Sequence, residues 1–260
     1  MQRFTDRRII ITGAGSGIGA ATVARLLEED GTVVACDVSE SGLAATAAAA
    51  EEAGTGKRLT TKVLDVSSEA AVADVVDAAV ADLGGLDVLV NAAAIQRCAH
   101  THEHTLADWN DTLAVNLTGT FLMTRRALPA LLDSGHGVVV NFTSTSASFA
   151  HPYMSAYAAS KGGVLAFTHG LALEYAKQGL RAVNVQPGGV ATALAMSTLD
   201  KMPEGYDIGL WGKQTPLLSQ PDGSILGEPG AVAGVIAMVA SDDGRFITGT
   251  EIRVDGGAHA

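Results

Sequence analysis

A tyrosine and a lysine four residues apart are the strongest candidates for chemistry in this sequence of 260 residues. Tyr157 and Lys161 stand at positions i and i+4 of a segment rich in helix formers, so they should lie on one helix face. A lysine ammonium a few ångströms away favours the tyrosinate and should lower a phenol pKa that is about 10 when unperturbed. Such a tyrosine can exchange a proton with an alcohol near neutral pH, so the spacing predicts an acid/base pair.

A glycine-rich turn near the start of the sequence indicates a second kind of chemistry. The residues Thr12-Gly13-Ala14-Gly15-Ser16-Gly17-Ile18-Gly19 follow an apolar run and lead into a segment of helix formers. Glycines let the backbone approach a pyrophosphate closely, and the free N–H groups at a helix start carry partial positive charge. Strand, glycine turn and helix in this order predict a dinucleotide site.

The second apolar run ends in Asp37, about 20 residues beyond the glycine turn, where the adenosine ribose should lie. A carboxylate there accepts hydrogen bonds from both ribose hydroxyls and repels a 2′-phosphate. No Arg or Lys follows Asp37 or replaces Ser16 to compensate. The cofactor is therefore expected to be NAD rather than NADP, the alternative being that Asp37 only caps the next turn.

Short apolar runs alternate with helical patterns along the chain. The runs read as strands, and the stretches between them carry apolar residues at a spacing of three to four. This alternation predicts an α/β protein with a doubly wound parallel sheet of Rossmann type, joined by right-handed crossovers and covered by helices on both faces. The expected strands are 8–12, 32–36, 59–64, 86–90, 137–141, 181–186 and 251–254, and the expected helices are 17–30, 42–53, 69–83, 106–132 and 155–177.

The alternation breaks once, at residues 193–227, where methionines, prolines and Trp211 follow no clear period. An irregular segment of this length inside a domain is usually functional. We expect a mobile flap over the active site. No linker, repeat or charge block divides the rest, so a single domain over residues 1–260 is expected.

Composition excludes several classes of protein. The chain is 47% hydrophobic with a formal net charge of −11, so its long-range field repels nucleic acids and anionic membrane surfaces. Cys36 and Cys98 show no metal spacing and form no disulfide framework. No apolar leader or membrane-spanning run is visible, and a cytoplasmic protein is expected.

These motifs, in this order, resemble the single-domain short-chain dehydrogenase/reductase family over nearly the whole chain. The resemblance is carried by Thr12-Gly13-x-x-x-Gly17-x-Gly19, Asp65, Asn91-Ala92-Ala93-Ala94, Asn116, Ser144, Tyr157-x-x-x-Lys161 and Pro187-Gly188. It implies that Ser144, rather than Thr145 or Ser146, hydrogen-bonds the substrate oxygen and that Tyr157 transfers the proton. Lys161 would hold the nicotinamide ribose and favour the Tyr157 anion, and Asn116 would hold a water that relays protons to solvent.

The same resemblance implies the cofactor contacts. Asp65, with the Val66 N–H nearby, would meet the adenine, and Val190 would present its backbone to the nicotinamide carboxamide. The full expected set is Gly13, Ser16, Gly17, Ile18, Gly19, Asp37, Asp65, Val66, Asn91, Tyr157, Lys161, Pro187 and Val190. The family usually has Asn-Asn-Ala-Gly where this chain has Asn91-Ala92-Ala93-Ala94. The missing amide at Ala92 should cost some stability but removes no group from the chemistry, and Ala94 replaces a glycine next to the cofactor.

Other residues have two interpretations. The alternating run His100-Thr101-His102-Glu103-His104 could suggest a metal site, but hydride chemistry needs none, and we expect a solvated loop or a wall of the substrate cleft. His151, Met154, Gln96 and Trp211 fit a substrate pocket as well as ordinary loop packing.

The expected activity is hydride transfer between nicotinamide and a secondary alcohol or ketone, with a small-molecule substrate. A 3-oxoacyl thioester reductase is the alternative enzyme, and a non-catalytic NAD-binding regulator is the alternative from another class. A homotetramer is expected from the resemblance. The expected helices 106–132 and 155–177 also carry more apolar residues than docking on a sheet requires, namely Leu113, Leu117, Phe121, Leu165, Phe167 and Leu171. The C-terminal strand would supply a second two-fold contact.

Overall fold

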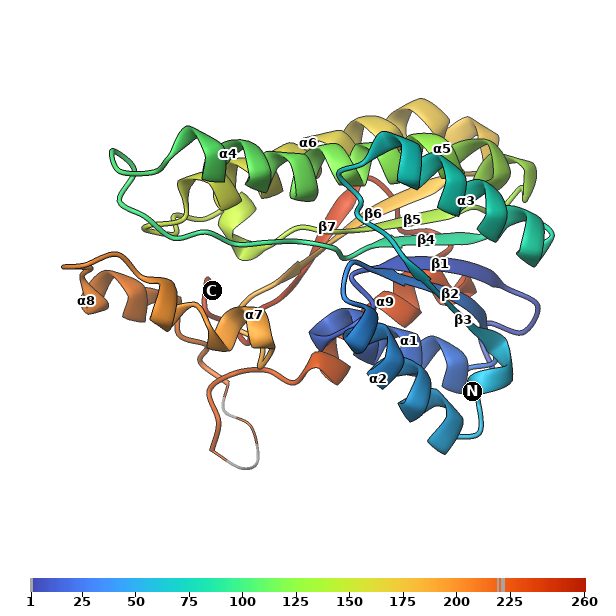
Figure 1. Cartoon of the computed structure of the whole chain (residues 1–260), viewed down its shortest axis with the longest axis horizontal. Helices are drawn as coiled ribbons and strands as arrows, with labels where there is room; N and C mark the ends of the chain where they lie inside the picture. Colours follow the sequence, from blue (N-terminus) through green and yellow to red (C-terminus); the bar gives the residue numbers. More distant parts are fainter. Residues whose placement is uncertain (1, 219, 221–222) are drawn as a thin grey trace.

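Seven parallel strands form one sheet in the computed structural model, which describes residues 2–218, 220 and 223–260. The strand order is β3-β2-β1-β4-β5-β6-β7, so the chain winds outward in both directions from β1 (Figure 1). The strands are β1 (Arg8–Thr12), β2 (Thr32–Asp37), β3 (Leu59–Val63), β4 (Val88–Asn91), β5 (Val138–Phe142), β6 (Arg181–Pro187) and β7 (Thr250–Val254). The expected doubly wound parallel sheet is confirmed.

Helices cover both faces of the sheet, as Figure 1 shows. One face carries α1 (Gly17–Glu28), α2 (Glu40–Glu52) and α9 (Pro229–Ala240), and the other carries α3 (Glu69–Leu83), α4 (Leu106–Leu113), α5 (Gly119–Asp133) and α6 (Ser155–Tyr175). The short helices α7 (Ala193–Met196) and α8 (Ile208–Trp211) lie beyond the carboxyl ends of the strands. The described residues also contain six 3-10 turns, at Gly56–Arg58, Thr145–Ala147, Ala176–Gln178, Leu199–Lys201, Gly212–Gln214 and Asp242–Gly244.

Two hydrophobic cores fill the spaces between the sheet and the helix layers. Successive strand residues point to opposite faces, so Ile9 and Ile11 join one core while Ile10 joins the other, and all three are fully buried. Burying one such side chain contributes about 1.5–3 kcal/mol. The central strands β1, β4 and β5 are buried on both faces, which explains why they read as continuous apolar runs rather than as alternating ones.

The structure corrects some expected boundaries. The helix expected at 106–132 is α4 and α5 joined by a π-helical segment, Ala114–Thr118, and α2 begins at Glu40 because the Ser39 side chain accepts the Gly42 N–H at 3.1 Å. Helix α9 was missing from the expected elements. The irregular segment 193–227 holds two short helices and two 3-10 turns, and its residues 219, 221 and 222 lie outside the described part of the chain.

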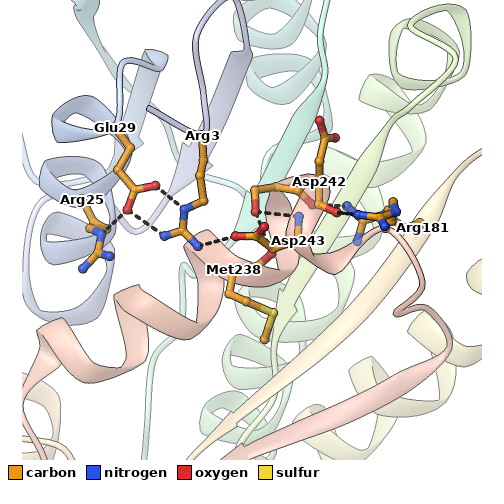
Figure 2. Close-up of polar contacts among 9 residues, drawn as sticks. Arg3, Arg25, Glu29, Arg181, Met238, Asp242 and Asp243 are labelled. Atoms are coloured by element: carbon orange, nitrogen blue, oxygen red, sulfur yellow. Dashed lines mark hydrogen bonds and ion pairs between the residues drawn. The ribbon is translucent and has the colours of Figure 1, made fainter. Parts of the chain in front are cut away.

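Charged groups fasten the helices at the amino edge of the sheet, opposite the carboxyl edge (Figure 2). Arg3 donates to Glu29 beyond α1, at 2.7 Å, and to Asp243 beyond α9, at 3.2 Å. Arg181 donates to the Val239 carbonyl oxygen at 2.6 Å, at the last turn of α9. These bonds tie the ends of α1 and α9 together at the amino edge. No described helix combines the length and apolar character needed to cross a membrane.

Candidate active site

A cavity of about 760 Å³ runs along the carboxyl edge of the sheet. It begins at the glycine turn, passes Asp37 and Asp65, and ends at Ser144, Tyr157 and Lys161. Residues from the 193–227 segment, including Leu194, form its outer wall. The cavity lining brings together most of the expected cofactor residues: Gly13, Ser16, Gly17, Ile18, Gly19, Asp37, Asp65, Val66, Tyr157, Lys161, Pro187 and Val190.

The glycine turn is shaped by close backbone packing. Gly13 has φ +69°, and a Cβ there would lie 2.7 Å from the backbone of Ala92. A Cβ on Gly19 would lie 1.9 Å from the Gly13 carbonyl oxygen, so only glycine lets α1 start against the turn. Helix α1 has no side-chain cap from Ser16 and no acidic residue in its first turn. Its free N–H groups therefore suit an anionic pyrophosphate at this end of the cavity.

Asp37 ends β2 beside the glycine turn. Its Oδ2 accepts the Gly15 N–H at 2.8 Å and its Oδ1 accepts the Ser39 N–H at 2.8 Å. Further along the cavity, Asp65 Oδ1 accepts the Ser67 N–H at 2.9 Å. Each carboxylate oxygen can accept more than one hydrogen bond, so both groups keep capacity for a ligand while the turns hold them in place.

Pro187 and Val190 lie where the sheet meets the 193–227 segment. Pro187 is the last residue of β6, and Val190 forms an isolated parallel bridge with Gly227. The Gly227 N–H donates to the Gly189 carbonyl oxygen at 2.9 Å, and the Ala191 N–H donates to the Gly227 carbonyl oxygen at 2.9 Å. The end of the segment is thus attached to the wall that carries Val190.

Tyr157, Ser144 and Lys161 meet at the inner end of the cavity. Tyr157 and Lys161 come from the first two turns of α6, and Lys161 Nζ lies 5.7 Å from the centre of the Tyr157 ring. Lys161 is buried and donates to the Phe142 carbonyl oxygen, at the end of β5, at 2.8 Å. The Tyr157 hydroxyl is hydrogen-bonded to Ser144, whose Oγ also accepts the Ser146 N–H at 3.1 Å.

The expected lowering of the tyrosine pKa is wrong for this buried pair. Burial raises the pKa of Tyr157 to about 12, and the hydrogen bond with Ser144 only partly opposes it. Burial also lowers the pKa of Lys161 to about 8, since the ammonium has lost its water. Desolvation therefore favours the neutral form of each group.

Two expected site residues lie outside the cavity lining. Asn116 is fully buried in the π-helical segment, and its side chain bonds the Ile95 N–H at 2.8 Å, the Ile95 carbonyl oxygen at 2.9 Å and Ser160 Oγ at 3.0 Å. Asn91 donates to Thr124 Oγ1 at 3.1 Å and to Asn141 Oδ1 at 2.8 Å. Neither side chain is free to point into the cavity.

Asn91 belongs instead to a polar row across the sheet. Asn91 in β4 is paired in register with Asn141 in β5, which is paired with Asn184 in β6, and all three are buried. Asn141 Nδ2 continues the row to Thr168 Oγ1 of α6 at 2.8 Å. The row joins β4 and β5 to the helix that carries Tyr157, and the sequence motif did not reveal it.

The alanines that depart from the family pattern have local substitutes. Thr12 Oγ1 accepts the N–H groups of Ala92 and Ala93, at 3.2 and 3.3 Å, and so ties β1 to the end of β4. Ala94 has no positive φ, so its position does not require glycine. The strand end therefore keeps a hydrogen-bonded brace without the missing amide.

In the structure, the histidine run lies outside the cavity lining, whereas the expected pocket residues belong to it. His100 Nε2 lies 3.1 Å from the Glu204 carbonyl oxygen, and its ring packs edge-on against Tyr153, with the ring centres 5.3 Å apart. No three described His, Cys, Asp or Glu residues gather closely enough to hold a metal ion. His151, Met154, Gln96 and Trp211 all line the cavity, as does Gln214, which no motif indicated.

Comparison with known proteins agrees with this arrangement. The family model for short chain dehydrogenase matches residues 7–203. The chain is 34% identical to levodione reductase of Leifsonia aquatica, over 99% of this chain and 96% of the relative, and 35% identical to the 3-oxoacyl-(acyl-carrier-protein) reductase of Thermotoga maritima, over 98% of each. It is 37% identical to cis-4-hydroxycyclohexanecarboxylate dehydrogenase of Sinomonas cyclohexanicum, over 98% of each. The crystal structure of levodione reductase superposes with a TM-score of 0.88, covering 98% of each chain.

Proposed function

The chain belongs to the short-chain dehydrogenase family, and from this premise we propose that it is an NAD-dependent oxidoreductase that interconverts a secondary alcohol and a ketone. The observation that carries the proposal is the meeting of Ser144, Tyr157 and Lys161 in one cavity with an uncapped helix start and Asp37 at its other end. The relatives are named as reductases and dehydrogenases, which agrees with this reaction class.

We assign the proton transfer to Tyr157. In the oxidative direction the substrate hydroxyl loses its proton to this oxygen, and in the reductive direction the Tyr157 O–H gives a proton to the carbonyl oxygen. Bound NAD supplies the hydride acceptor. Ser144, which is hydrogen-bonded to Tyr157, is placed to bond the same substrate oxygen and fix its position.

Lys161 supports Tyr157 from the same face of α6. When it is protonated, its charge favours the tyrosinate that forms during alcohol oxidation, and its bond to the Phe142 carbonyl oxygen holds it beside the ring.

Asn116 is proposed as the start of a proton path to solvent. Both N–H groups of the Asn116 side-chain amide already donate. A relay water would therefore have to donate to the side-chain oxygen or to the backbone carbonyl oxygen of Asn116.

The proposed preference for NAD rests on Asp37. Its carboxylate lies at the ribose end of the cavity, and Ser16 and Val38, which line the same end, bring no positive charge for a 2′-phosphate. The alternative activity, reduction of 3-oxoacyl thioesters, is favoured by the similarity to the Thermotoga maritima reductase. Cofactor choice and substrate choice together separate the two activities.

The experiment is a turnover survey of the purified protein with NAD, NADH, NADP and NADPH. The substrates are simple secondary alcohols, their ketones and a 3-oxoacyl thioester. We expect oxidation of alcohols with NAD and a loss of at least about 100-fold in Tyr157→Phe, while the variant still binds NADH. Equal turnover by Tyr157→Phe, or activity confined to NADPH and the thioester, would overturn the proposal.

A further inference from the structure

His151 is a cavity residue that the proposed chemistry does not use. It follows the 3-10 turn Thr145–Ala147, lines the cavity near Ser144, and has its Nε2 3.2 Å from Thr145 Oγ1. The imidazole therefore contacts Thr145, which directly follows Ser144, the residue that should hold the reacting oxygen. A ring nitrogen in this place can meet a second polar group of the substrate.

The His151 ring is held by the segment that follows β7. Its ring stacks on His259, with centres 5.6 Å apart and planes inclined by 16°. The His259 ring also stacks on Phe149, with centres 4.4 Å apart and planes inclined by 23°. Two parts of the chain that are about a hundred positions apart in the sequence are thus packed face to face behind one wall of the cavity.

Charged groups fix His259 in this stack. Its Nδ1 lies 3.1 Å from Asp255 Oδ2, and Arg253 Nη1 donates to its carbonyl oxygen at 2.9 Å. The Arg253 guanidinium lies 5.2 Å from the centre of the Phe149 ring, on which His259 is stacked. Asp255 is itself buried and accepts the Gly257 N–H at 3.0 Å. This is a rigid support for His151 rather than a loose surface contact.

His151 carries no charge at neutral pH. Burial, together with the neighbouring His259, lowers its pKa to about 4. A neutral imidazole offers one N–H and one lone pair, so it bonds hydroxyl and carbonyl groups without demanding an ion.

The other residues that line the inner end of the cavity, near Ser144 and Tyr157, are also mostly uncharged. Gln214 Nε2 is buried without a hydrogen-bond partner among the described residues, and Gln96 Nε2 lies 3.1 Å from Met154 Sδ and 3.7 Å from Cys98 Sγ, which are weak acceptors. The lining residues that fall from Thr143 to Leu226 in the sequence are otherwise largely apolar. The apolar members include Met154, Leu194, Met196, Leu199, Trp211 and Leu226. Among the lining residues that the structure describes at this end, Lys161 alone is a Lys, Arg, Asp or Glu.

We propose that the substrate is an uncharged, mainly apolar secondary alcohol or ketone with a second hydroxyl or carbonyl group that His151 binds, and that His259 is the residue that positions His151. The inference rests on the proposed oxidoreductase function. It goes further by naming the substrate class and the residue that selects it. A site built to bond a polar group discriminates strongly against an analogue that lacks it, because its own buried group is then left unpaired.

The test compares matched substrates in the NAD-dependent oxidation. Cyclohexanol is measured against cyclohexane-1,2-, 1,3- and 1,4-diol, and butan-2-ol against butane-2,3-diol, with 3-hydroxycyclohexanecarboxylate as an anionic probe. We expect kcat/KM for at least one diol to exceed that for its mono-alcohol by roughly 10-fold or more, and the carboxylate to be the poorest substrate. The His151→Phe variant keeps the ring stack and should reduce the diol preference to within about 3-fold.

His259 is tested by two variants. His259→Ala removes both the stack and the bond to Asp255 and should reduce the diol preference mainly through KM. His259→Phe keeps the stack and should retain more of the preference, which a general loss of folding would not do. His102→Ala, an exposed histidine outside the cavity lining, is the matched control and should leave both activity and preference unchanged.

Equal kcat/KM for diols and mono-alcohols in the unmodified protein would overturn the inference, as would a preference for the carboxylate or a diol preference that survives in His151→Phe. These results leave the proposed oxidoreductase intact, since alcohols would still be turned over. A complete lack of alcohol oxidation with either cofactor would overturn the proposed function and the inference together.

Discussion

The Asp37 carboxylate accepts the Gly15 N–H at 2.8 Å and so ties the end of β2 to the glycine turn. The contact is close, because a Cβ on Gly15 would lie 3.0 Å from the Asp37 carboxylate. Asp37 therefore has two tasks in the proposed site. It would bond the ribose and it also shapes the turn that receives the pyrophosphate.

We expect the two tasks of Asp37 to separate in two variants. With its oxygen toward Gly15, Asp37→Asn keeps that bond, loses the bond from the Ser39 N–H and removes the charge. NADPH should then bind more tightly than before, while NADH binds about 10-fold more weakly. Asp37→Ala also loses the bond to Gly15 and should weaken both cofactors. Dissociation constants for NADH and NADPH, measured by nicotinamide fluorescence, check this.

The unmodified protein is the reference for the cofactor measurement. We expect it to bind NADH at least about 10-fold more tightly than NADPH, because the carboxylate repels a 2′-phosphate. Tighter binding of NADPH by the unmodified protein would contradict the role given to Asp37.

Lys161 should give the stability of the protein a specific pH dependence. Burial lowers its pKa to about 8, whereas the unfolded chain keeps the ordinary value of about 10.4. Between these values the unfolded chain holds a proton that the folded chain lacks, so the free energy of unfolding should rise with pH. The buried charge destabilises the fold below pH 8, and this penalty disappears as pH rises through the window.

The matched variant is Lys161→Met, which keeps an apolar stem and has no titrating group. The difference in free energy of unfolding between the unmodified protein and this variant should increase by up to about 1.4 kcal/mol per pH unit between pH 8 and 10. Urea unfolding at several pH values measures it. Tyr157 and Cys36, whose pKa values burial raises to about 12, should contribute similarly to both proteins. A flat difference would show that the folded Lys161 keeps its ordinary pKa.

Local patterns predicted most of the sheet and the meeting of Tyr157 with Lys161. Strand, turn and helix signals lie within a few residues of one another, and Tyr157 and Lys161 are one helical turn apart, so spacing alone places them together. The direction of the Tyr157 pKa was missed because it depends on burial, which comes from the whole fold. The stack of His151 on His259 joins distant parts of the chain, and no local pattern encodes such a contact.

The asparagine row is another feature that pairing across the sheet creates. Asn141 lies in its centre, accepting from Asn91 at 2.8 Å and donating to Thr168 at 2.8 Å. We expect Asn141→Ala to leave both partners without these bonds and to lower the free energy of unfolding by roughly 2–5 kcal/mol. Chemical denaturation measures this loss. Thr60→Ala, on the exposed part of β3, is the control and should change stability by less than about 1 kcal/mol.

The outer face of α5 and α6 is our candidate for the contact that forms a homotetramer. Leu171 is buried in the core of its own chain, so this member of the expected apolar set is not available to a partner. Phe121 is 40% exposed and meets Phe167 edge-on, with ring centres 6.1 Å apart, and Leu173 is 86% exposed. Exposed large apolar side chains on two helices of the same layer suit a two-fold contact with a second copy.

We expect sedimentation at micromolar concentration to give a species near four times the 26.5 kDa mass of one chain. Phe121→Glu and Leu173→Glu should each shift the protein to smaller species, because a two-fold contact brings each new carboxylate and its copy into one desolvated interface. Val63→Thr, on the edge strand β3, removes a comparably exposed apolar group from another surface and should leave the assembly unchanged. A dominant 26.5 kDa species in the unmodified protein would refute the tetramer. A tetramer that persists in both glutamate variants would instead place the contact on another face.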